Sequence, residues 1–241
     1  MRAMERKDLV EIKKGQTGTG LLIEHDGYIS SEVGNNRKLF EDIESARRNG
    51  DDFYCPNPFI VSAVFQKFGI ENANGRIYPE TVLKREVSKY LDKIRERRAI
   101  GECNHPSESV IDLSRVAINI VDLRWEGHTL IGELEIVTSP GFRKYGIISC
   151  QGDQVANLIL QGIKIGVSSR GLGSVTSKMG VLYVGDDYEI VCWDVVSDPS
   201  TPGAWIDQKP ENLQQYMESK EESEKERLIE NLKKFDDWLK N

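Results

Sequence analysis

Two stretches of alternating side chains, joined by a very short turn, constrain the fold of this chain more than any other feature. In residues 116–125 apolar side chains recur at every second position from Val116 to Ile120, which is the period of a half-buried strand. A turn centred on Gly127 follows, and residues 129–137 form the returning strand. Because strands joined by so short a turn pair antiparallel, the chain is expected to contain an antiparallel sheet.

The remaining segments add strands and a few helices. Helices are predicted at 79–98, where Pro79 opens the apolar periodicity, and at 153–161; further strands are predicted at 163–169, 180–184 and 188–196, the last two as a hairpin, and residues 59–68 suit a strand or a short helix. We therefore expect an α+β fold with a mostly antiparallel β-sheet or barrel core flanked by helices.

Composition divides the chain into three parts. Residues 1–50, with a Gly/Thr linker and one brief helix, are predicted to be a partly ordered N-terminal extension, and residues 51–208 to be the main domain. Residues 209–241 are predicted to form a charged amphipathic helix. One narrow apolar stripe marks this helix: Leu228, Leu232, Phe235 and Leu239.

Charge and cysteine usage exclude several classes of function. The net charge of −7 gives no basic surface for direct nucleic-acid binding, and no apolar run reaches the roughly 20 residues that span a bilayer. The charged N-terminus lacks a secretory signal, so we expect the protein to stay in the cytoplasm. The four scattered cysteines predict neither a metal site nor any cofactor, and are expected to be reduced thiols: Cys55, Cys103, Cys150 and Cys192.

Two short motifs carry candidate catalytic residues. His105 lies in an Asn-His-Pro turn within the segment 101–106, and a serine pair lies among glycines and beside an arginine in the segment 166–174. Proline restricts its own backbone and that of the preceding residue, while glycine lets a substrate backbone approach closely. A histidine base and a serine nucleophile are the parts needed for acyl transfer. Cys103 is an alternative nucleophile, although a small buried thiol is the simpler interpretation.

Strand alternation distinguishes the two serines. Neighbouring residues of a strand point to opposite faces, so only one of Ser168 and Ser169 can share a face with the base. Ser169 continues the apolar face of Ile165 and Val167, whereas Ser168 shares the other face with Gly166. We therefore predict Ser168 as the nucleophile, with Ser169 forming a hydrogen bond within the turn.

A third residue must orient the imidazole. Asp194 lies within the strand predicted at 188–196, and a carboxylate among apolar neighbours needs a histidine or an arginine as partner. Asp198 is the rival, although Asp-Pro-Ser is typical of a turn, and Glu102 is a weaker candidate close to His105.

Four ordered motifs resemble the prohead core proteases of tailed bacteriophages. They are Asn-Gly-Arg-Ile-Tyr-Pro at 74–79, Gly-Glu-Cys-Asn-His-Pro at 101–106, Gly-Val-Ser-Ser-Arg-Gly-Leu-Gly-Ser at 166–174, and the segment 194–205 from Asp194 to Trp205. Members of that family are similar in fold to the herpesvirus assemblins. They cut scaffold and shell proteins inside the immature capsid.

The resemblance implies roles for residues around the nucleophile. Residues 51–208 would form the serine protease domain, with an aspartate at position 194 as in the family motif. Arg170, Ser169 and Gly171 are expected to stabilise the oxyanion, because the assemblin-like fold uses arginine and backbone N–H groups there. The substrate groove is assigned to four residues, while the alternative for the segment 74–79 is to start the following helix: Asn74, Gly75, Arg76 and Asn104.

The same resemblance implies partners and self-processing. Scaffold or core proteins and the major capsid protein are the expected substrates, inside the assembling prohead in the host cytoplasm, and the oligomeric state is left open. Many family members cut after a glutamate that follows an aliphatic residue two positions earlier. We therefore expect self-cleavage after Glu24 or Glu230.

Two rival functions stay open from the sequence. A non-catalytic scaffold or capsid-assembly factor that retains the protease fold would hold His105, Ser168 and Asp194 far apart. An esterase would use the same serine and histidine, but Arg170 stands where a Gly-x-Ser-x-Gly motif needs glycine.

Overall fold

The computed structural model describes residues 10–29, 33–49, 54–106 and 108–197. The strands are β1 Gly18–Ile29, β2 Ile60–Lys67, β3 Arg76–Ile77, β4 Ile100–Glu102, β5 Val116–Glu126, β6 Thr129–Ile136, β7 Gly166–Lys178, β8 Val181–Val184 and β9 Glu189–Val196. The helices are α1 Asn36–Arg48, α2 Glu80–Arg95, α3 Pro140–Tyr145 and α4 Gln151–Leu160, with a 3-10 turn at Leu113–Arg115.

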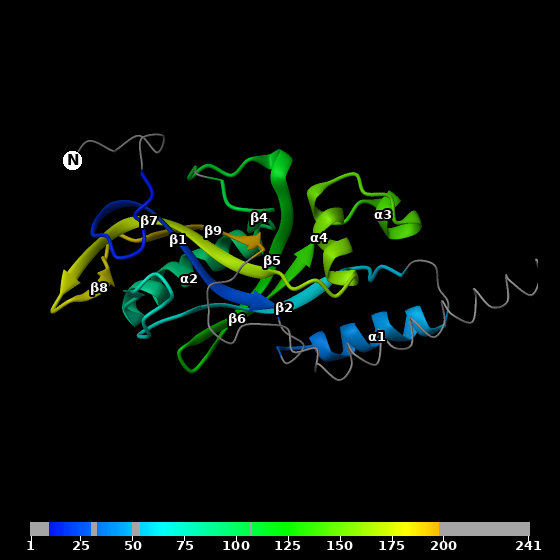
Figure 1. The fold of residues 1–241 in the computed structure, drawn as a ribbon, viewed down its shortest axis with the longest axis horizontal. Coiled ribbons are helices and arrows are strands. Elements are labelled where there is room, and N and C mark those ends of the chain that lie inside the picture. The colour runs from blue at the N-terminus through cyan, green and yellow to red at the C-terminus, as the bar shows by residue number, and fades with distance from the viewer. Residues whose placement is uncertain (1–9, 30–32, 50–53, 107, 198–241) are drawn as a thin grey trace, which may run out of the picture. The chain divides into compact units, whose positions relative to one another are not determined.

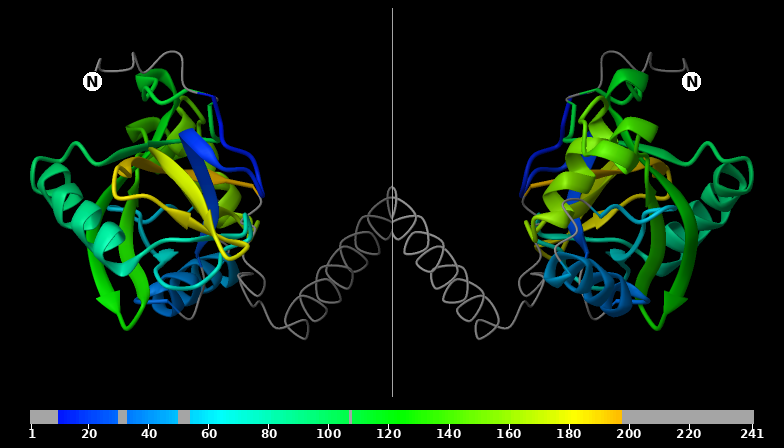
Figure 2. Two further views of the ribbon diagram at one scale, coloured as in Figure 1. Left: turned by 90° about the vertical axis from the view of Figure 1, so that its left-hand side faces the viewer. Right: turned by 90° about the vertical axis from the view of Figure 1, so that its right-hand side faces the viewer.

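All described strands belong to one sheet. Its order is β3-β8-β7-β1-β2-β6-β5-β4, and β9 pairs with β7 as well. Every pairing is antiparallel except the short one between β3 and β8. Figure 1 shows the helices distributed around these strands, and the side views of Figure 2 show that they do not gather on one face. The expected α+β class, with a mostly antiparallel core, is confirmed.

The sheet curls until its two ends meet. Cys103, directly after β4, forms an isolated parallel bridge with Val195 of β9, and the Asn104 N–H donates to the Val195 carbonyl at 2.8 Å. A side chain at Gly101 would collide with the carbonyl oxygen of Trp193, so glycine permits this close approach. Strands far apart along the sheet consequently face each other across a shared core.

Aromatic side chains fill that core. Trp193 lies edge-on to Phe65 of β2, with ring centroids 5.4 Å apart, and edge-on to Tyr90 of α2 at 4.8 Å. Helix α2 also covers main-chain groups at the start of β9: Arg85 donates to the Tyr188 carbonyl and Lys93 to that of Val191. Side chains of the helix thus donate hydrogen bonds to carbonyl groups at this end of β9, which the three-residue strand β4 does not pair with.

The N-terminal segment corrects the expected domain boundary at residue 50. Strand β1 lies in the middle of the sheet, between β7 and β2, and its Leu21, Leu22 and Ile29 are buried. Residues 18–29 are therefore part of the main domain and not an extension of it. The helix expected at 209–241 lies outside the described residues.

The expected hairpin at 180–196 is also wrong. Strands β8 and β9 both pair with β7, β8 along residues 175–178 and β9 along residues 166–172. They follow one another along the same neighbour because β7 runs on to Lys178, well beyond the strand predicted at 163–169. The β7–β8 hairpin projects at one end of the molecule in Figure 1.

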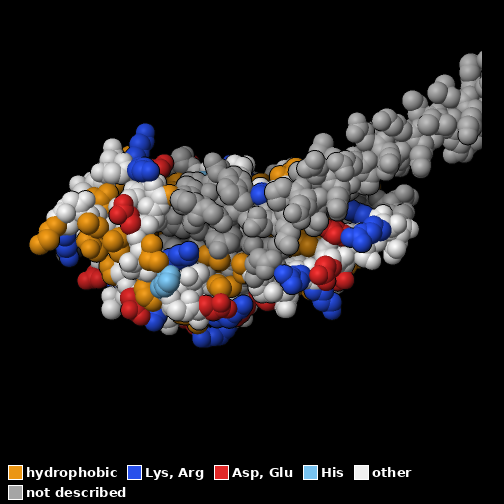
Figure 3. All heavy atoms as spheres, turned by 60° about the horizontal axis from the view of Figure 1, so that its bottom comes forward, with side chains coloured by type: hydrophobic (Ala, Val, Ile, Leu, Met, Phe, Trp, Pro, Cys, Tyr) orange, Lys and Arg blue, Asp and Glu red, His pale blue; other side chains and the backbone are white. Residues whose placement is uncertain are grey.

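The described surface mixes both signs of charge. On the face drawn in Figure 3, acidic and basic side chains are interspersed, and apolar side chains gather at the end that carries β8. Met179, in the turn between β7 and β8, is fully exposed. In the part of the chain that the structure describes, no helix combines the length and apolar character needed to cross a bilayer.

Candidate active site

Strands β7 and β9 place three polar side chains on one face of the sheet, here called the triad face. Ser168 stands directly opposite Asp194, and Arg170 stands opposite Cys192. Ser169 is paired with Trp193, so it faces the other way, as strand alternation predicts. Ser168, Arg170 and Asp194 are fully buried.

The turn after β4 brings His105 to this face. Asn104 has a φ of 63°, a left-handed conformation that asparagine adopts more readily than most residues. Its N–H is held by Val195, next to Asp194 in β9. The Asn-His-Pro motif therefore forms the sharp turn at which the end of β4 meets β9, and this turn places the imidazole on the triad face.

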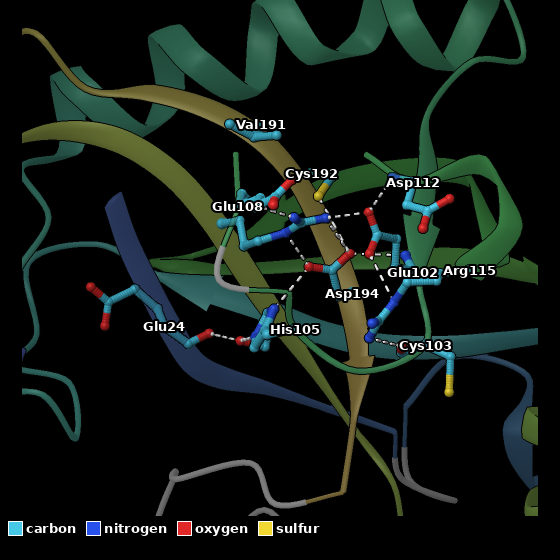
Figure 4. A network of polar contacts seen from close by, with 12 residues as sticks. Glu24, Glu102, Cys103, His105, Glu108, Asp112, Arg115, Val191, Cys192 and Asp194 are labelled. Atoms are coloured by element: carbon cyan, nitrogen blue, oxygen red, sulfur yellow. Dashed lines mark hydrogen bonds and ion pairs between the residues drawn. The ribbon is translucent and has the colours of Figure 1, made fainter. Parts of the chain in front are cut away.

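His105 joins the serine and the aspartate in one chain of hydrogen bonds (Figure 4). Its Nδ1 lies 2.8 Å from Asp194 Oδ2, and its Nε2 is hydrogen-bonded to the Ser168 hydroxyl. Because a carboxylate only accepts, Nδ1 carries the proton and Nε2 of the neutral ring is free to accept one. The His105 side chain is 10% exposed, whereas that of Asp194 is inaccessible. The imidazole thus lies between buried groups and solvent.

Neighbouring donors keep Asp194 ionised. The Glu102 N–H donates to Oδ1 at 2.8 Å, and the Arg170 guanidinium lies 2.5 Å from Oδ2. Burial alone would raise the pKa of Asp194, but the hydrogen bond from His105 and the charge of Arg170 outweigh it, so the pKa lies below its ordinary value. A permanently charged Asp194 is suited to orienting an imidazole and stabilising its protonated form.

The contacts of Arg170 differ from those expected of an oxyanion donor. Its Nη2 lies 3.1 Å from Glu102 Oε1, and its Nη1 donates to the Glu108 carbonyl at 2.7 Å. Asp194 is its third partner, so the guanidinium lies between two carboxylates and a main-chain carbonyl.

The two glycines that follow lie within a regular strand. Gly171 was expected beside the oxyanion, and β7 continues through it and through Gly173. A side chain on Gly171 would overlap the Tyr188 ring, and one on Gly173 would crowd the Tyr188 main chain. Glycine is required there by the packing of Tyr188. Ser169 is buried on the face opposite the triad.

Glu102, the weaker candidate for orienting His105, is a second buried carboxylate of the same region. Its Oε1 accepts from the Asp112 N–H and from Arg170, and its Oε2 lies 3.4 Å from Arg115 Nε. Its side chain therefore supports Arg170, while its main chain supports Asp194. Asp198, the other rival, lies outside the described residues.

Most of the residues assigned to a substrate groove lie elsewhere. Asn74 and Arg76 both bind the Glu24 carboxylate, and Arg76 is only 1% exposed, so Arg76 does not line an open groove. Gly75 forms the turn between them with a φ of 76°. Of the four residues, only Asn104 is exposed beside the triad.

The structure contradicts self-cleavage after Glu24. This residue is 1% exposed and lies in a central strand, where a protease cannot reach an extended backbone without unfolding the sheet. Glu230, the other expected site, lies outside the described residues.

Two contacts of the triad were missed from the sequence. The Cys192 thiol lies 3.4 Å from Asp194 Oδ1, and the Ser168 hydroxyl donates to the main-chain carbonyl of Glu24 at 2.7 Å. The first contact was predictable, because Cys192 lies two residues before Asp194 in one strand and alternation places both side chains on the same face. No local pattern predicts the second contact, because it joins two residues that are 144 positions apart in the sequence. Within the described segments no group of three His, Cys, Asp or Glu side chains is arranged so that it could hold a metal ion.

A serine, a histidine and a carboxylate hydrogen-bonded in series on an antiparallel sheet are the geometry of a nucleophilic hydrolase. Residues 21–218 match the family of prohead core protein serine proteases, so this chain belongs to that family. The family that the four motifs indicated is confirmed, and the chain is a protease of phage prohead assembly.

One sequence relative and one solved structure agree with this assignment. The prohead core protein protease of Enterobacteria phage T4 is 32% identical over 164 residues, which cover 67% of this chain and 74% of the relative. The structure of the bacteriophage T4 capsid assembly protease gp21 superposes with a TM-score of 0.56 at 24% identity, covering 74% of this chain and 98% of that one. At that identity the second match supports the fold alone.

Proposed function

We propose that this protein is a serine endopeptidase with Ser168 as nucleophile, His105 as general base and Asp194 as the residue that orients His105. The observation that carries the proposal is the continuous hydrogen-bonded series from Asp194 Oδ2 through both ring nitrogens of His105 to the Ser168 hydroxyl. A scaffold protein that had merely kept the fold would have no reason to keep this alignment.

The geometry defines the order of proton transfers. His105 Nε2 takes the hydroxyl proton as Ser168 Oγ attacks the scissile carbonyl, and the imidazolium is stabilised by Asp194 at Nδ1. The same nitrogen then protonates the leaving amine, which leaves an acyl group on Ser168. Water enters and loses a proton to His105 as it attacks the acyl carbon. His105 then returns this proton to Ser168 Oγ, and the acyl group leaves as the carboxylic acid product. No step requires a metal or cofactor.

The substrates we propose are the core or scaffold proteins and the major capsid protein of the prohead. The names of the family and of its T4 relatives place these proteases in the prohead core and in capsid assembly. Enclosure in the assembling prohead, in the host cytoplasm, would bring enzyme and substrates together at high local concentration.

The test compares Ser168→Ala with Ser169→Ala on peptides taken from the core and capsid proteins. Ser168→Ala should lower kcat at least about 10⁴-fold with its circular dichroism spectrum unchanged, as for removal of a triad nucleophile. Ser169→Ala, on the opposite face, should retain measurable turnover. Substantial activity in folded Ser168→Ala would refute the assignment, and turnover of esters but not of peptides would favour an esterase.

Self-processing is proposed at one site, after Glu230 in Leu228-Ile229-Glu230. Intact-mass measurement of the purified protein should show loss of the residues after 230, and Ser168→Ala should keep them. Identical trimming of both proteins would assign the cut to a host protease instead.

A further inference from the structure

The motif at 74–79 has no role in the triad, but its side chains converge on one buried carboxylate. Glu24 Oε2 accepts from Asn72 and from Asn74, each at 2.7 Å. Glu24 Oε1 is 2.6 Å from Arg76 Nη1 and accepts from the Tyr78 hydroxyl at 2.9 Å. Four donors thus hold a single side chain of β1, and we call this set the Glu24 network.

The same residues also hold the main chain of β1. The Asn74 amide that donates to Glu24 also donates to the Ile23 carbonyl of β1 at 2.9 Å. Arg76 donates to the Ile12 carbonyl, in the segment before β1 whose Ile12 N–H donates to the Leu21 carbonyl of β1. The first contact fixes the main chain of β1 directly, and the second fixes the segment that lies beside it.

What β1 presents to the triad at this point is a carbonyl group. The register of β1 and β7 shifts between Glu24 and Gly27, so two residues of β1 stand opposite Ser168 alone. Bulges of this kind re-aim groups next to active sites. Here the Glu24 carbonyl accepts a hydrogen bond from Ser168 at 2.7 Å, and Figure 4 shows the Glu24 carboxylate directed away from the triad.

The serine hydroxyl therefore has two acceptors for one proton. While His105 is neutral, Nε2 and the Glu24 carbonyl compete for it. When His105 is protonated, Nε2 donates to Ser168 Oγ and the hydroxyl proton goes to Glu24, so that each of the three contacts carries a proton. The carbonyl of Glu24 thus competes with Nε2 for the hydroxyl proton while His105 is neutral, and holds the Ser168 oxygen in place when His105 is protonated.

We propose that Asn72, Asn74, Arg76 and Tyr78 are positioning residues for the nucleophile, acting through Glu24. They hold Glu24 so that its carbonyl keeps the Ser168 hydroxyl in line with His105. The inference rests on the proposed assignment of Ser168. It differs from the substrate-groove assignment, because the four residues act on the enzyme's own oxygen and not on the peptide.

The test is Asn74→Ala, which removes contacts to Glu24 and to Ile23 from a half-buried position. We expect kcat to fall about 10- to 100-fold, as for a small misplacement of a reacting group, with KM nearly unchanged. The rate at which a small organofluorophosphate modifies Ser168 should fall by the same factor, because this probe does not span a peptide groove. The acidic limb of kcat/KM should move to lower pH, because the protonated state loses its aligned acceptor.

Asn36→Ala is the matched control. Its amide also binds strand backbone, donating to the Ser62 carbonyl and accepting from the Ser62 N–H, both at 2.7 Å, but on β2. This variant should melt at a lower temperature than the parent while keeping kcat, the probe rate and the pH profile. Tyr78→Phe, which deletes one donor to Glu24, should show the Asn74→Ala pattern more weakly and serves if Asn74→Ala does not fold.

Three results would overturn the inference: unchanged kcat and probe rate in folded Asn74→Ala and Tyr78→Phe, equal kinetic losses in the Asn36 and Asn74 variants, or a raised KM with an unchanged probe rate. The last result would instead support a role of Asn74 in binding the peptide substrate, as expected from the sequence. Failure of the proposed function appears separately, because Ser168→Ala would then keep turnover or the probe would modify another residue.

Discussion

Two buried carboxylates lie on opposite faces of this sheet, and only one belongs to the triad. Asp194 accepts from Glu102 and His105 and pairs with Arg170. Glu24 accepts from two asparagines and a tyrosine and pairs with Arg76. Both side chains are inaccessible to solvent, and both have a buried arginine as partner. Burial and ion pairing alone therefore do not distinguish a catalytic carboxylate from a structural one.

The difference lies in which partner can exchange a proton. Burial raises the pKa of Tyr78 well above its ordinary value, and the negative charge of Glu24 raises it further, so this hydroxyl keeps its proton. Asp194, in contrast, has an imidazole as partner, and that imidazole reaches solvent. A buried carboxylate becomes useful for catalysis when one of its partners can accept and release a proton and can reach the substrate.

The two arginines also differ in how many carboxylates surround them. Arg170 lies between Asp194 and Glu102, whereas Glu24 is the one carboxylate paired with Arg76 among the described residues. Loss of Asp194 would leave Arg170 with a charged partner. Loss of the Glu24 charge would leave Arg76 buried without one, which is costly.

The largest expected effect separates these two carboxylates. Asp194→Asn should lower kcat about 10⁴-fold, because it removes the group that sets the His105 tautomer. Its loss of stability should be smaller than that of Glu24→Gln, because Arg170 keeps Glu102 as a charged partner. Glu24→Gln keeps the main-chain carbonyl, so kcat should fall far less, while the free energy of unfolding should drop by about 3–5 kcal/mol. Steady-state kinetics and urea unfolding of both variants measure the contrast. Equal losses of kcat in the two variants would show that Asp194 and Glu24 do not differ in their importance for catalysis.

Arg170→Met is the next variant, because it tests whether this arginine acts on Asp194 or on the oxyanion. Removing a positive charge beside the Asp194–His105 pair favours the protonated imidazole, so the acidic limb of kcat/KM should move to higher pH. A loss of activity of about 10²–10³-fold with an unmoved limb would instead support the oxyanion role expected from the sequence. The pH dependence of kcat/KM in Arg170→Met decides between them.

Local patterns predicted several elements of the fold correctly. The hairpin of β5 and β6 and the helices α2 and α4 follow from two-residue and helical periodicity, since each element buries a face that its own residues define. The opposite orientations of Ser168 and Ser169 also follow, because alternation along a strand is a local property.

Features that depend on pairing between distant segments were not predictable in this way. The sequence of β1 mixes glycine, threonine and charge, and its central place comes from pairing with β7, far along the chain. The same holds for Arg170, because only the register of β7 against β9 decides that its guanidinium reaches Asp194. Glu24 carried a usable signal, since a charged residue next to Leu22 and Ile23 needs a buried partner, but its partner Arg76 could not be identified from spacing.

The wild-type protein should lose activity and stability at different pH values. We expect kcat/KM to rise as the pH is raised from acidic values, because only a neutral His105 accepts the serine proton. Asp194 has a lowered pKa, so its contribution to stability is complete above the ordinary aspartate range, near pH 4, and is lost only as the pH falls through the lowered value.

Activity should therefore be lost on acidification well before the fold is. Measuring kcat/KM and circular dichroism in the same buffers checks this order. Unfolding that coincides with the loss of activity, or a flat profile between about pH 5 and pH 8, would contradict a histidine base held by an aspartate that stays ionised across this range.

Another buried carboxylate, Asp153 at the start of α4, should have the smallest effect on activity when it is changed. It accepts from the N–H and hydroxyl groups of Ser139 and Ser149 and from the Cys150 N–H, all neutral donors. Burial raises its pKa, but these hydrogen bonds prevail and lower the pKa to about 2. The stabilisation is present above the ordinary aspartate pKa, near 4, and disappears as the pH falls toward about 2, which corresponds to roughly 2 kcal/mol.

Asp153→Asn should remove this stabilisation, because its amide nitrogen cannot accept the bonds that one carboxylate oxygen now receives from Ser149 and Cys150. Urea unfolding at neutral pH should show a loss of about 2 kcal/mol, and the variant should lose less stability than the parent between about pH 4 and pH 2. Since Asp153 contacts neither network, kcat and the acidic limb should match those of the parent. A kinetic change in this variant would show that any disturbed carboxylate disturbs the triad, and the contrast between Asp194 and Glu24 would lose its meaning.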